Sequence, residues 1–592
     1  MCGISGTYSF DGHLDRTNVS AMHDMLTHRG PDETYSLDTH CVSAKLGRLG
    51  MNGLATGWQP AHDSTQRYVA LTNGEIYNAQ TLIDELELTI PDGNAVDVAI
   101  IPELISRFGI DGLKKVDGQF ACMVFDKQER RLILARDRFG VCPLYYAVLG
   151  NKVHFCSELK PIVRTVNHRW QLDATAVDQY FNLGNVVAPN TLVSDVKAVE
   201  PGCAVLFDVA SIDVHRYWRF GEFDVSDSPV DPEQLHETVK RSVADRLHSE
   251  VEIGSYLSGG FDSSAILADA SALSESPIKT FSVTFDEPGL DESKFQRTVS
   301  DAMHSIHHEV VCSKGDIGRR FEEMVRHCCF PQRETYNVAA LMLSESVQLS
   351  GVKGVLSGEG ADELFFGYDS YIFDSLAKNK TSESMVNEQA WGRADFSWEV
   401  DPIKVQARKE VFLSQSMQDA IKGNEYWRKR LIPYSESELK GLSKMQLRSI
   451  ADVYVQLSGH LLGDHGDAMV MANSIEGRYP FLGNSVVAMA MNISDAQKVA
   501  NFEGKACLRK AYDQVLPREV LTRAKQGFTA YDLVHVVDDK TWSRWRELTH
   551  SAGIFNNHCM DNRFSNYREE KWDFRLASIS LAIIIDELGL HV

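Results

Sequence analysis

A chain of 592 residues has room for roughly two to four domains of about 150 residues each. Its composition, 43% hydrophobic and 24% charged residues, is close to the average of globular proteins and excludes a disordered, collagen-like or low-complexity chain. Eighty-two Asp and Glu residues against 60 Lys and Arg leave a formal charge of -22. This charge disfavours binding to nucleic-acid phosphates and to anionic membranes.

The cysteines and the N-terminus indicate a protein of the reducing cytoplasm. Eleven cysteines are spread over the chain without CxxC pairs, which predicts neither a disulfide framework nor a zinc site. The first six residues lack a basic and apolar leader, and the longest apolar run, around Leu581 to Ile585, is far shorter than a membrane span. We therefore expect a cytoplasmic protein without a membrane segment.

The first part of the chain, to about Val209, has the alternating apolar pattern of half-buried strands. The pattern is clearest at residues 68–71, 122–125, 144–148 and 153–155. Gly150 and Asn151, between the last two of these segments, suit a tight hairpin turn. For residues 1–210 we expect a domain of antiparallel sheet with a few helices.

A linker is predicted over residues 211–234, where Gly221, Pro229 and Pro232 stand among acidic side chains. In the remaining residues, 235–592, apolar strands are each followed by a helical segment. This alternation predicts a second domain, with a parallel sheet that is covered by helices on its faces.

Three strands of this second domain can be placed from their apolar runs. They are expected at residues 251–257, 280–285 and 354–356. Ligands bind beyond the carboxyl ends of parallel strands, so the glycine-rich loops after Leu257 and Leu356 are expected to share one site. Residues 374–457 are charged and have a helical period, but they carry no chemical signature.

Cys2 becomes the first residue if Met1 is removed, which places a thiol and a free α-amino group on one residue. The amine titrates near pH 8 (about 7.7 to 8.0), so at neutral pH it can accept the proton of a thiol that titrates near 8.5. The same half carries six further motifs: His28-Arg29-Gly30-Pro31-Asp32, Arg48, Asn73 to Asn78, Asp97, Asp117 to Ala121 and Ala135 to Gly140. In this order and spacing they resemble the glutaminase domain of the class II glutamine amidotransferases. The resemblance implies that Cys2 attacks the side-chain amide of glutamine, while the Asn73 side chain and the Gly74 backbone N–H form the oxyanion hole.

The resemblance also implies how glutamine is held. Arg48 would bind its α-carboxylate and Asp97 its α-amino group, with Glu75 nearby. A planar guanidinium suits a carboxylate, and an anion suits an ammonium group. The chain departs from the family pattern at Leu46, where a His is frequent, and at Gly50, where a Ser is frequent.

Residues 258–264, Ser-Gly-Gly-Phe-Asp-Ser-Ser, follow a predicted strand and open a helix. Glycines let the backbone approach a phosphate, hydroxyls and helix N–H groups bind it, and Asp262 suits the accompanying Mg²⁺. The string resembles the pyrophosphate loop of the ATP pyrophosphatases, and the chain has no Walker A lysine loop. The resemblance implies an ATP site at Leu257, Ser258, Gly259, Gly260, Asp262, Ser263, Ser264, Val283, Ser357 and Gly358.

Two further segments extend this second resemblance. Residues 357–363 resemble the second loop of the same family, in which Asp362 would share Mg²⁺ with Asp262. Residues 523–528 resemble the loop whose lysine, here Lys525, neutralises charge on the adenylate and the departing pyrophosphate.

Together the two halves resemble the glutamine-dependent asparagine synthetases over almost the whole chain. Further matches are Pro201-Gly202, Lys279 to Val283, Ser474 to Leu482, and Lys505 with Leu508-Arg509. The resemblance implies an α+β N-terminal-nucleophile sandwich of antiparallel sheets, followed by an α/β ATP-pyrophosphatase domain with a parallel sheet. Glutamine, ATP and a small carboxylic acid would be the substrates and Mg²⁺ the metal, and ammonia would pass through an internal tunnel to an acyl-adenylate. A homodimer is one option for the assembly.

The role of Glu359 and the identity of the acid stay open. Glu359 is a candidate to orient the ammonia or to accept a proton from it, and a structural carboxylate is the other interpretation. The family often has an Arg at the place of Ala468 and an Asp at that of Gly483, so either a salt bridge was lost as a pair or the acceptor pocket changed. Many relatives also have Asp-Glu-Pro where this chain has Cys329-Phe330-Pro331.

These departures favour an acceptor other than aspartate, such as a sugar acid or a natural-product acid. Three alternatives remain: a true asparagine synthetase that uses aspartate, an enzyme that closes an amide within one molecule, and a catalytically inactive scaffold. Relatives that close a ring tend to lose the glutaminase cysteine, and here Cys2 is present.

Overall fold

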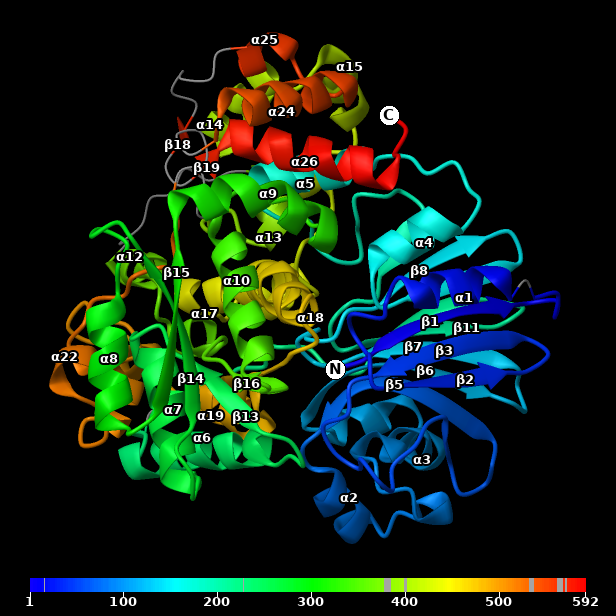
Figure 1. The fold of residues 1–592 in the computed structure, drawn as a ribbon, viewed down its shortest axis with the longest axis horizontal. Helices are drawn as coiled ribbons and strands as arrows, with labels where there is room; N and C mark the ends of the chain where they lie inside the picture. Colours follow the sequence, from blue (N-terminus) through cyan, green and yellow to red (C-terminus); the bar gives the residue numbers. More distant parts are fainter. Residues whose placement is uncertain are drawn as a thin grey trace.

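The chain folds into two lobes that lie side by side in this computed structural model (Figure 1). The structure describes residues 1–14, 16–226, 228–376, 385–398, 402–531, 537–561, 568–569 and 572–592. Residues of the N-terminal half, blue to cyan in Figure 1, form most of one lobe, and most of the C-terminal half forms the other. The cyan helix α5 (Ala174–Leu183) is an exception and lies beside the C-terminal helix α26 (Phe574–Leu588).

Two six-stranded antiparallel sheets form the centre of the N-terminal lobe. The first has the order β10 (Val196–Ala198), β8 (Tyr145–Leu149), β9 (Lys152–Cys156), β1 (Gly3–Ser9), β3 (Val42–Arg48), β2 (Glu33–Asp38). The second has the order β12 (Ile212–Arg216), β11 (Cys203–Phe207), β7 (Arg131–Arg136), β6 (Gly118–Asp126), β5 (Tyr68–Ile76), β4 (Ala61–His62). Strands β1 and β3 of the first sheet lie against β5 of the second, so the two sheets stack face to face.

Helices cover the outer faces of this sandwich. Helices α1 (Thr17–Asp24) and α4 (Leu159–Thr165) lie on the first sheet, and α3 (Ile100–Phe108) lies on the second, with α2 (Ala79–Leu86) beside it (Figure 1). Strand β1 is buried along its whole length, as expected for a strand with packed layers on both sides. The predicted antiparallel sandwich is confirmed.

The predicted hairpin and linker can be compared with the strands directly. Strands β8 and β9 pair in antiparallel register, with Val148 opposite Val153, so the hairpin around Gly150 is present. Strand β12 pairs with β11 as far as Arg216. The second sheet therefore continues past residue 210, into the segment that the sequence assigned to a linker.

A five-stranded parallel sheet forms the centre of the C-terminal lobe. Its order is β15 (Ile306–Cys312), β14 (Lys279–Phe285), β13 (Ile253–Tyr256), β16 (Gly354–Leu356), β17 (Glu476–Arg478). Every neighbouring pair is parallel, which confirms the predicted α/β domain, although β15 and β17 were not predicted as strands. The carboxyl ends of β13 and β16 are neighbours, so the loops after them meet.

Helices surround this sheet and extend to the top of the molecule. Those packed on or next to the sheet are α6 (Pro232–Leu247), α7 (Phe261–Leu273), α8 (Ser293–Ala302), α9 (Lys314–Cys328) and α10 (Tyr336–Leu349). A segment of π-helix, η5 (Asp452–Leu461) and η6 (Gly463–Asp467), leads into α18 (Ala468–Met471). Turns of π-helix often occur at functional sites.

Most of the remaining elements are short. Those of the N-terminal half are η1 (Pro91–Gly93), η2 (Asp97–Ala99), η3 (Ile110–Lys115) and α5 (Ala174–Leu183). Those of the C-terminal half are α11 (Ala361–Phe365), α12 (Asp369–Leu376), α13 (Met385–Trp391), α14 (Pro402–Phe412), α15 (Gln415–Ile421), η4 (Tyr426–Arg428), α16 (Glu436–Leu439), α17 (Lys444–Ala451), η7 (Pro480–Leu482), α19 (Asn484–Asn492), α20 (Asp495–Lys498), α21 (Ala506–Ala511), α22 (Arg518–Leu521), α24 (Asp539–Ser551), α25 (Asn557–Asp561), β18 (Arg568–Glu569), β19 (Trp572–Asp573) and α26 (Phe574–Leu588).

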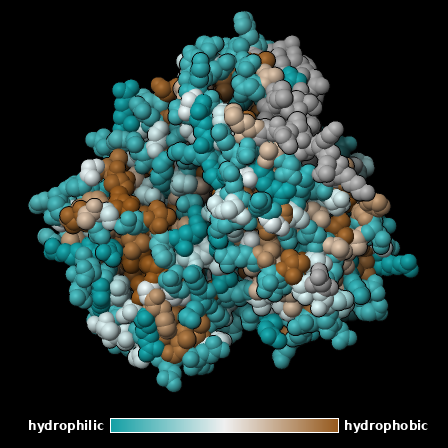
Figure 2. Space-filling view, turned by 180° about the vertical axis from the view of Figure 1, so that it is seen from behind, coloured by the Kyte–Doolittle hydropathy of each residue, from teal (hydrophilic) through white to brown (hydrophobic). Residues whose placement is uncertain are grey.

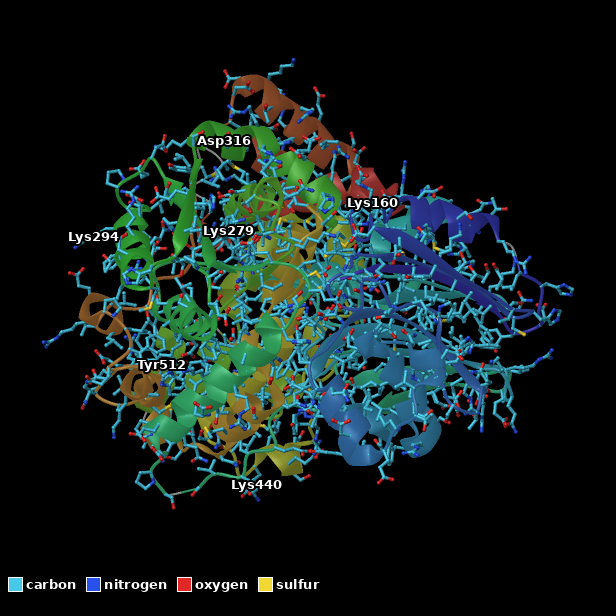
Figure 3. The ribbon with its side chains drawn as sticks, turned by 60° about the horizontal axis from the view of Figure 1, so that its bottom comes forward. Lys160, Lys279, Lys294, Asp316, Lys440 and Tyr512 are labelled. Carbon is cyan, nitrogen blue, oxygen red and sulfur yellow. The ribbon has the colours of Figure 1, made fainter. Side chains whose placement is uncertain are left out.

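The last helix, α26, joins the two lobes. Lys160 of α4 forms an ion pair with Glu587 of α26 at 2.7 Å, and Figure 3 shows Lys160 where the two lobes meet. The rear face of the molecule is largely hydrophilic and is interrupted by apolar patches (Figure 2). Within the described part of the chain, no helix has the length and apolar character needed to cross a membrane.

Candidate active sites

Cys2 lies at the start of β1, buried beside the side chain of Asn73 on β5. Its backbone nitrogen donates to Asn73 Oδ1 at 2.5 Å, and its carbonyl accepts from Arg29 Nε at 3.1 Å. The amide nitrogen Nδ2 of Asn73 is buried and has no hydrogen-bond partner among the described residues. A fixed, unpaired donor next to the thiol is what a developing oxyanion requires, so the sequence-predicted pair Cys2 and Asn73 is brought together.

Met1 precedes the predicted nucleophile in this structure and is itself buried. Its α-ammonium forms an ion pair with Glu476 of β17 at 2.5 Å, and its sulfur lies 3.4 Å from the Cys142 sulfur. The nitrogen of Cys2 is therefore a peptide nitrogen here. Removal of Met1 would turn it into an amine and would leave Glu476 without this cation.

Gly74 and Arg48 have different surroundings from each other. Gly74 has φ +144°, and a Cβ there would lie 2.0 Å from the Gln119 carbonyl oxygen, so only glycine fits.

Arg48 donates to the Glu33 carboxylate at 2.8 Å and to the backbone carbonyl of Gly57 at 3.1 Å. Its other nitrogen holds the carbonyls of Asn52 and Gly53. Arg48 thus fastens a loop in this structure, and its binding of a glutamine carboxylate stays a prediction.

Glu75 and Asp97 form a buried acidic pair at the end of β5. Asp97 accepts a hydrogen bond from the Ile76 backbone N–H, and Glu75 accepts one from Asn52 Nδ2 at 2.7 Å. Burial raises the pKa of Asp97 to about 6, and burial together with Asp97 raises the pKa of Glu75 well above its usual value. Glu75 also forms an ion pair with Arg478 at 3.5 Å, and the ammonium group of a ligand would supply a cation to Asp97.

The two glycine-rich loops of the C-terminal lobe touch each other. A Cβ on Gly358 would lie 2.9 Å from Asp262 Cβ, so no larger residue fits between the loops. Within the first loop, Ser258 Oγ lies 3.0 Å from Ser263 Oγ and accepts from the Gly260 backbone N–H at 3.2 Å. The loop after β13 and the loop after β16 therefore form one site, as the sequence predicted.

Lysine side chains connect the acidic residues of these two loops. Lys505 Nζ donates to both carboxylate oxygens of Asp262 at 2.7 Å and lies 2.6 Å from Asp362. Lys525 Nζ lies 2.6 Å from Asp362 and 3.9 Å from Asp262. Burial alone would raise the pKa of Asp362, but the two lysines hold it well below its usual value.

The same carboxylates suit Mg²⁺. Carboxylate oxygens from two loops lie within 2.7 Å of one cation, Lys505 Nζ, so they converge closely enough to share a metal ion. A Cβ on Gly367 would lie 2.0 Å from an Asp362 oxygen, so this carboxylate needs a glycine beside it. Among the residues the structure describes, no third acidic or imidazole side chain completes a metal cluster. Phosphate oxygens would have to supply further ligands.

The remaining ATP-site predictions fall around the same loops. Arg523 donates to the Gly259 carbonyl at 3.0 Å, which places the lysine loop over the first phosphate loop. The Leu257 carbonyl accepts from the Ser282 hydroxyl, and the Val283 carbonyl accepts from Gln296 Nε2 at 3.0 Å. Both carbonyls are therefore engaged within the protein.

Glu359 belongs to the second loop and is half-buried there. The Ser357 hydroxyl donates to Glu359, and the Ser357 backbone N–H donates to the Arg478 carbonyl at 2.9 Å. Burial raises the pKa of Glu359, and burial, with the charge of Glu359 as a further cause, raises the pKa of Tyr479. The exchange of a proton by Glu359 stays a prediction.

Some of the residues in these sites were not predicted from the sequence. Lys505 was quoted only as a motif match, and Arg29 lay in a quoted motif without a role. Asp467 accepts from both terminal nitrogens of Arg29 at 2.7 and 2.8 Å. Both residues stand in motifs that the sequence shows, and this was the available signal for a role. Their carboxylate partners, Asp262 for Lys505 and Asp467 for Arg29, lie hundreds of residues away in the chain, so the pairing could not be predicted.

Comparison with known proteins gives two adjoining family matches. Residues 1–218 match the glutamine amidotransferase domain, and residues 234–586 match asparagine synthase. Asparagine synthetase 1 of Bacillus subtilis is 30% identical over 562 residues, covering 89% of this chain and 87% of its own. Asparagine synthetase 3 of the same organism is 27% identical over 555 residues, with the same two coverages.

A relative with a different name matches over a similar length. The protein named amidase chry2 of Gibberella zeae is 26% identical over 620 residues, covering 89% of this chain and 88% of its own. The family matches span both lobes and meet at the boundary between them, so the chain belongs to the asparagine synthase family as a glutamine-dependent, amide-forming ligase.

Proposed function

We propose that this enzyme releases ammonia from glutamine in residues 1–216 and uses it in residues 235–592 to amidate an adenylated carboxylic acid other than aspartate. The observation that carries the proposal is the bridge formed by Lys505 between Asp262 and Asp362. This bridge brings together in one place the charged groups that the phosphate chain of ATP requires.

All described cysteines are free, which supports a reducing, cytoplasmic setting.

Glutamine hydrolysis begins at Cys2 once Met1 has been removed. The new α-amine takes the thiol proton, and the sulfur attacks the amide carbon of glutamine. Asn73 Nδ2 donates to the oxygen as it becomes negative, because this group has no other partner in the part of the chain that the structure describes. Ammonia leaves, and water then releases glutamate from the thioester.

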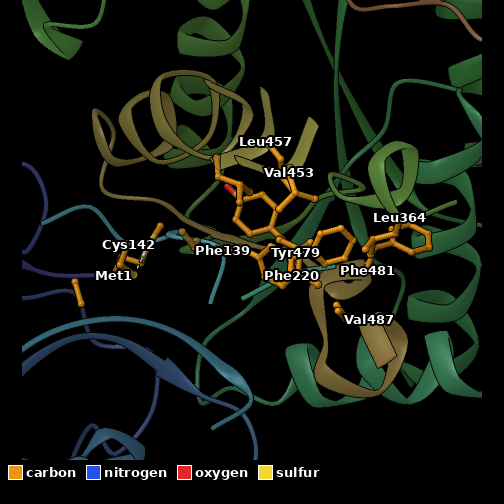
Figure 4. Packing of buried hydrophobic residues seen from close by; sticks show 14 of the residues in the cluster. Met1, Phe139, Cys142, Phe220, Leu364, Val453, Leu457, Tyr479, Phe481 and Val487 are labelled. Atoms are coloured by element: carbon orange, nitrogen blue, oxygen red, sulfur yellow. Dashed lines mark hydrogen bonds between the residues drawn. The ribbon is translucent and has the colours of Figure 1, made fainter. Parts of the chain in front are cut away.

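Ammonia reaches the second site along the core between the lobes. One buried cluster contains Met1, Cys142 and Tyr479 and extends to Leu364 of α11, beside Asp362 (Figure 4). Apolar walls favour neutral ammonia over ammonium, since they offer a charge no solvation. A route through this cluster keeps the nucleophile unprotonated.

Adenylation of the acid occurs at the paired loops. A carboxylate oxygen attacks the α-phosphorus of ATP, and the bond to pyrophosphate breaks. Lys525 and Lys505 neutralise the leaving pyrophosphate, and Mg²⁺ held by Asp262 and Asp362 supplies further charge neutralisation when bound. Ammonia then attacks the acyl carbon, AMP leaves, and Glu359 accepts the surplus proton.

The surroundings of the lysine loop support an acceptor with less charge than aspartate. Phe528, three positions after Lys525, lies 5.5 Å from the Tyr336 ring and 5.9 Å from the His465 ring. Burial lowers the pKa of His465 to about 4, so this imidazole is neutral at pH 7. Aspartate would bring a second carboxylate, for which an aromatic and neutral wall is a poor partner.

The relatives support both sides of this choice. The two Bacillus subtilis relatives are named asparagine synthetases, whereas the relatives from Gibberella zeae and Penicillium rubens are named amidases.

A panel of carboxylic acids tests the proposal. With glutamine and ATP present, acid-dependent release of pyrophosphate is measured for aspartate and for aromatic, sugar and aliphatic acids, and the amide product is identified by mass spectrometry. We expect at least one other acid to exceed aspartate in kcat/KM. Efficient formation of asparagine, with an aspartate KM of about 1 μM to 1 mM, would assign this chain to the true asparagine synthetases.

A further inference from the structure

A cavity lies between the two lobes, away from the paired loops. Its volume is about 80 Å³, and it opens in part to solvent. One wall comes from the N-terminal half and includes Tyr145, Leu159 and Ala188, and the other comes from Phe330 and the π-helical segment. One water molecule needs about 10 to 15 Å³, so the space is larger than a single bound water fills.

The charged groups in the cavity walls cancel one another. Arg29 is paired with Glu158 at 3.2 Å and with Asp467 at 2.7 Å. Arg136 donates to three backbone carbonyls, those of Cys142, Val199 and Gly140. Two arginines therefore face two carboxylates, and the walls offer no excess charge to an ion.

His327 does not change this balance. It lines the cavity beside Glu158 and His28, and its ring lies 5.1 Å from the His28 ring. Burial lowers the pKa of His327, although Glu158 acts in the opposite direction. The imidazole is neutral at pH 7 and adds no cation.

One polar group in the walls lacks a partner. Ser458 lines the cavity on the π-helical segment, only 7% of its surface is exposed, and its hydroxyl has no hydrogen-bond partner among the described residues. An unpaired buried hydroxyl costs free energy, about 1 to 3 kcal/mol, unless a ligand or water satisfies it. The hydroxyl is thus a ready hydrogen-bonding group in walls whose arginines and carboxylates are already engaged with protein partners.

The glycines of this segment keep the cavity open. A Cβ on Gly463 would meet Phe330 Cζ and the Ser458 carbonyl oxygen only at 3.9 Å, an ordinary contact distance. Larger side chains at Gly463 would therefore project into the hollow without a backbone clash. The same holds at the small residue Ala468, which also lines it.

We propose that this cavity is a binding site for an uncharged, largely apolar small molecule of aromatic-ring size, whose one polar group bonds to the Ser458 hydroxyl. The site is separate from the adenylation centre and from the glutamine site. Its occupant would touch Arg29, which also holds the Cys2 carbonyl, so it would lie next to the link between the two active sites.

Benzamide and benzoate are a matched pair of probes, since they share a ring and differ in charge. Saturation-transfer NMR and calorimetry on the full chain should show benzamide binding and at least about tenfold weaker benzoate binding, because walls with balanced charges do not solvate an extra anion. Equal or stronger binding of benzoate, or no binding of benzamide, would overturn the proposal.

Variants locate the bound probe. Gly463→Leu and Ala468→Leu fill the hollow from two positions, and each should weaken benzamide at least about tenfold, whereas Ser458→Ala should weaken it about fivefold through loss of one hydrogen bond. Gly441→Leu, at an exposed glycine with nothing within 4 Å of its Cβ position, is the control and should bind as the wild type does. Unfolding curves show which variants are folded.

A competition experiment separates this site from the adenylation centre. Saturating ATP with Mg²⁺ should leave benzamide binding unchanged. If ATP displaces benzamide, or if both filling variants fold and still bind it at wild-type strength, the ligand lies elsewhere and the assignment of the cavity is wrong.

Discussion

Arg29 and Asp467 join the two lobes through a buried, two-pronged ion pair. Both terminal nitrogens of Arg29 donate to Asp467, at 2.7 and 2.8 Å, while its Nε donates to the Cys2 carbonyl at 3.1 Å. The side chains are 1% and 4% exposed. The residue that positions the nucleophile is therefore fastened to the π-helix of the synthetase lobe.

Asp467→Asn should weaken the coupling of the two reactions. Arg29 would keep Glu158 and the Cys2 carbonyl, so glutamine hydrolysis continues, but the lobes lose a buried charge pair whose disruption typically costs about 3 to 5 kcal/mol. We expect the ratio of glutamate formed to amide formed to rise above that of the wild type. The ratio is measured by chromatography of both products.

Lys353→Met is the control for this pair, because Lys353 bridges the lobes to Asp32 at 2.7 Å but both side chains are about one-third exposed. An exposed pair contributes about 0 to 1 kcal/mol, so stability and coupling should hardly change. Equal effects of the two variants would contradict a special role for Asp467.

Cys2→Ala should abolish glutamine hydrolysis and leave amidation from added ammonium salts, because adenylation occurs in the other lobe. Glutamate release and pyrophosphate release are assayed separately. Cys156→Ala, at a buried cysteine of β9, should retain both activities. A Cys2→Ala protein that is folded by circular dichroism but cannot use ammonia would refute the division of labour.

Lys505→Met should block pyrophosphate release while sparing glutaminase activity. Lys505 is 3% exposed and holds Asp262 and Asp362 together. Its loss leaves Lys525, at 2.6 Å from Asp362 but 3.9 Å from Asp262, to neutralise both carboxylates. A drop in kcat of about 10²- to 10³-fold is expected, as for removal of one preorganised electrostatic group. Asp262→Asn and Asp362→Asn should behave alike.

The reference for Lys505→Met is Lys279→Met. Lys279 is the first residue of β14 and forms a partly exposed ion pair with Glu252. That variant should release pyrophosphate at the wild-type rate. If Lys505→Met does so as well, phosphate chemistry is located elsewhere.

Glutamine binding should release protons near pH 6. The pKa of Asp97 is about 6 in the folded protein against about 3.9 unfolded, so between these values the folded state holds a proton that the unfolded chain has lost. Stability therefore falls as pH rises through this window. An ammonium group beside Asp97 reverses the shift. Asp97 is about half protonated at pH 6, so up to about half a proton should leave per glutamine bound at that pH.

This release is measured by calorimetry in buffers of different ionisation enthalpy, with Cys2→Ala so that glutamine is not consumed. Asp97→Asn in this background should reduce the release, and Asp92→Asn, at a nearby exposed position, should not. Proton uptake on binding would show that the ammonium group does not approach Asp97.

The sequence predicted which residues make up the two sites better than it predicted which oppositely charged residues form ion pairs with them. Local signals suffice for a strand, a glycine-rich loop or a hairpin, because they involve neighbouring residues, as with Gly150 between β8 and β9. The meeting of Asp262 and Asp362 followed from the rule on parallel strands. Lys505 and Asp467 were missed as partners because nothing local indicates which distant carboxylate or guanidinium a buried charge will meet.

Arg48 shows what residue type and spacing leave open, since its role in binding glutamine stays a prediction. The residue type fits a carboxylate, yet in the folded protein its terminal nitrogens are engaged with Glu33 and with loop carbonyls from Asn52 to Gly57. The hydrogen-bond partners of an arginine depend on loop conformation, which residue spacing does not encode.

Ala468 and Gly483 replace an Arg and an Asp that occur in the family pattern, and the structure separates their surroundings. Ala468 lines the cavity between the lobes, whereas a Cβ at Gly483 would lie 2.2 Å from Ser242 Oγ and 3.2 Å from a terminal nitrogen of Arg246. An Asp at 483 would thus meet Arg246, which now pairs with Asp117 at 2.9 Å.

A double-mutant cycle therefore tests whether the two changes removed one salt bridge. Gly483→Asp should destabilise by about 1 to 3 kcal/mol through crowding against Ser242, and Ala468→Arg by a similar amount through filling the cavity with a charge. Because their neighbours differ, the effects in the double variant should add within about 0.5 kcal/mol, measured by denaturant unfolding. Recovery of stability in the double variant by more than 1 kcal/mol would reveal a direct pair. In that case the two residues record a lost salt bridge, and they would no longer support an acceptor other than aspartate.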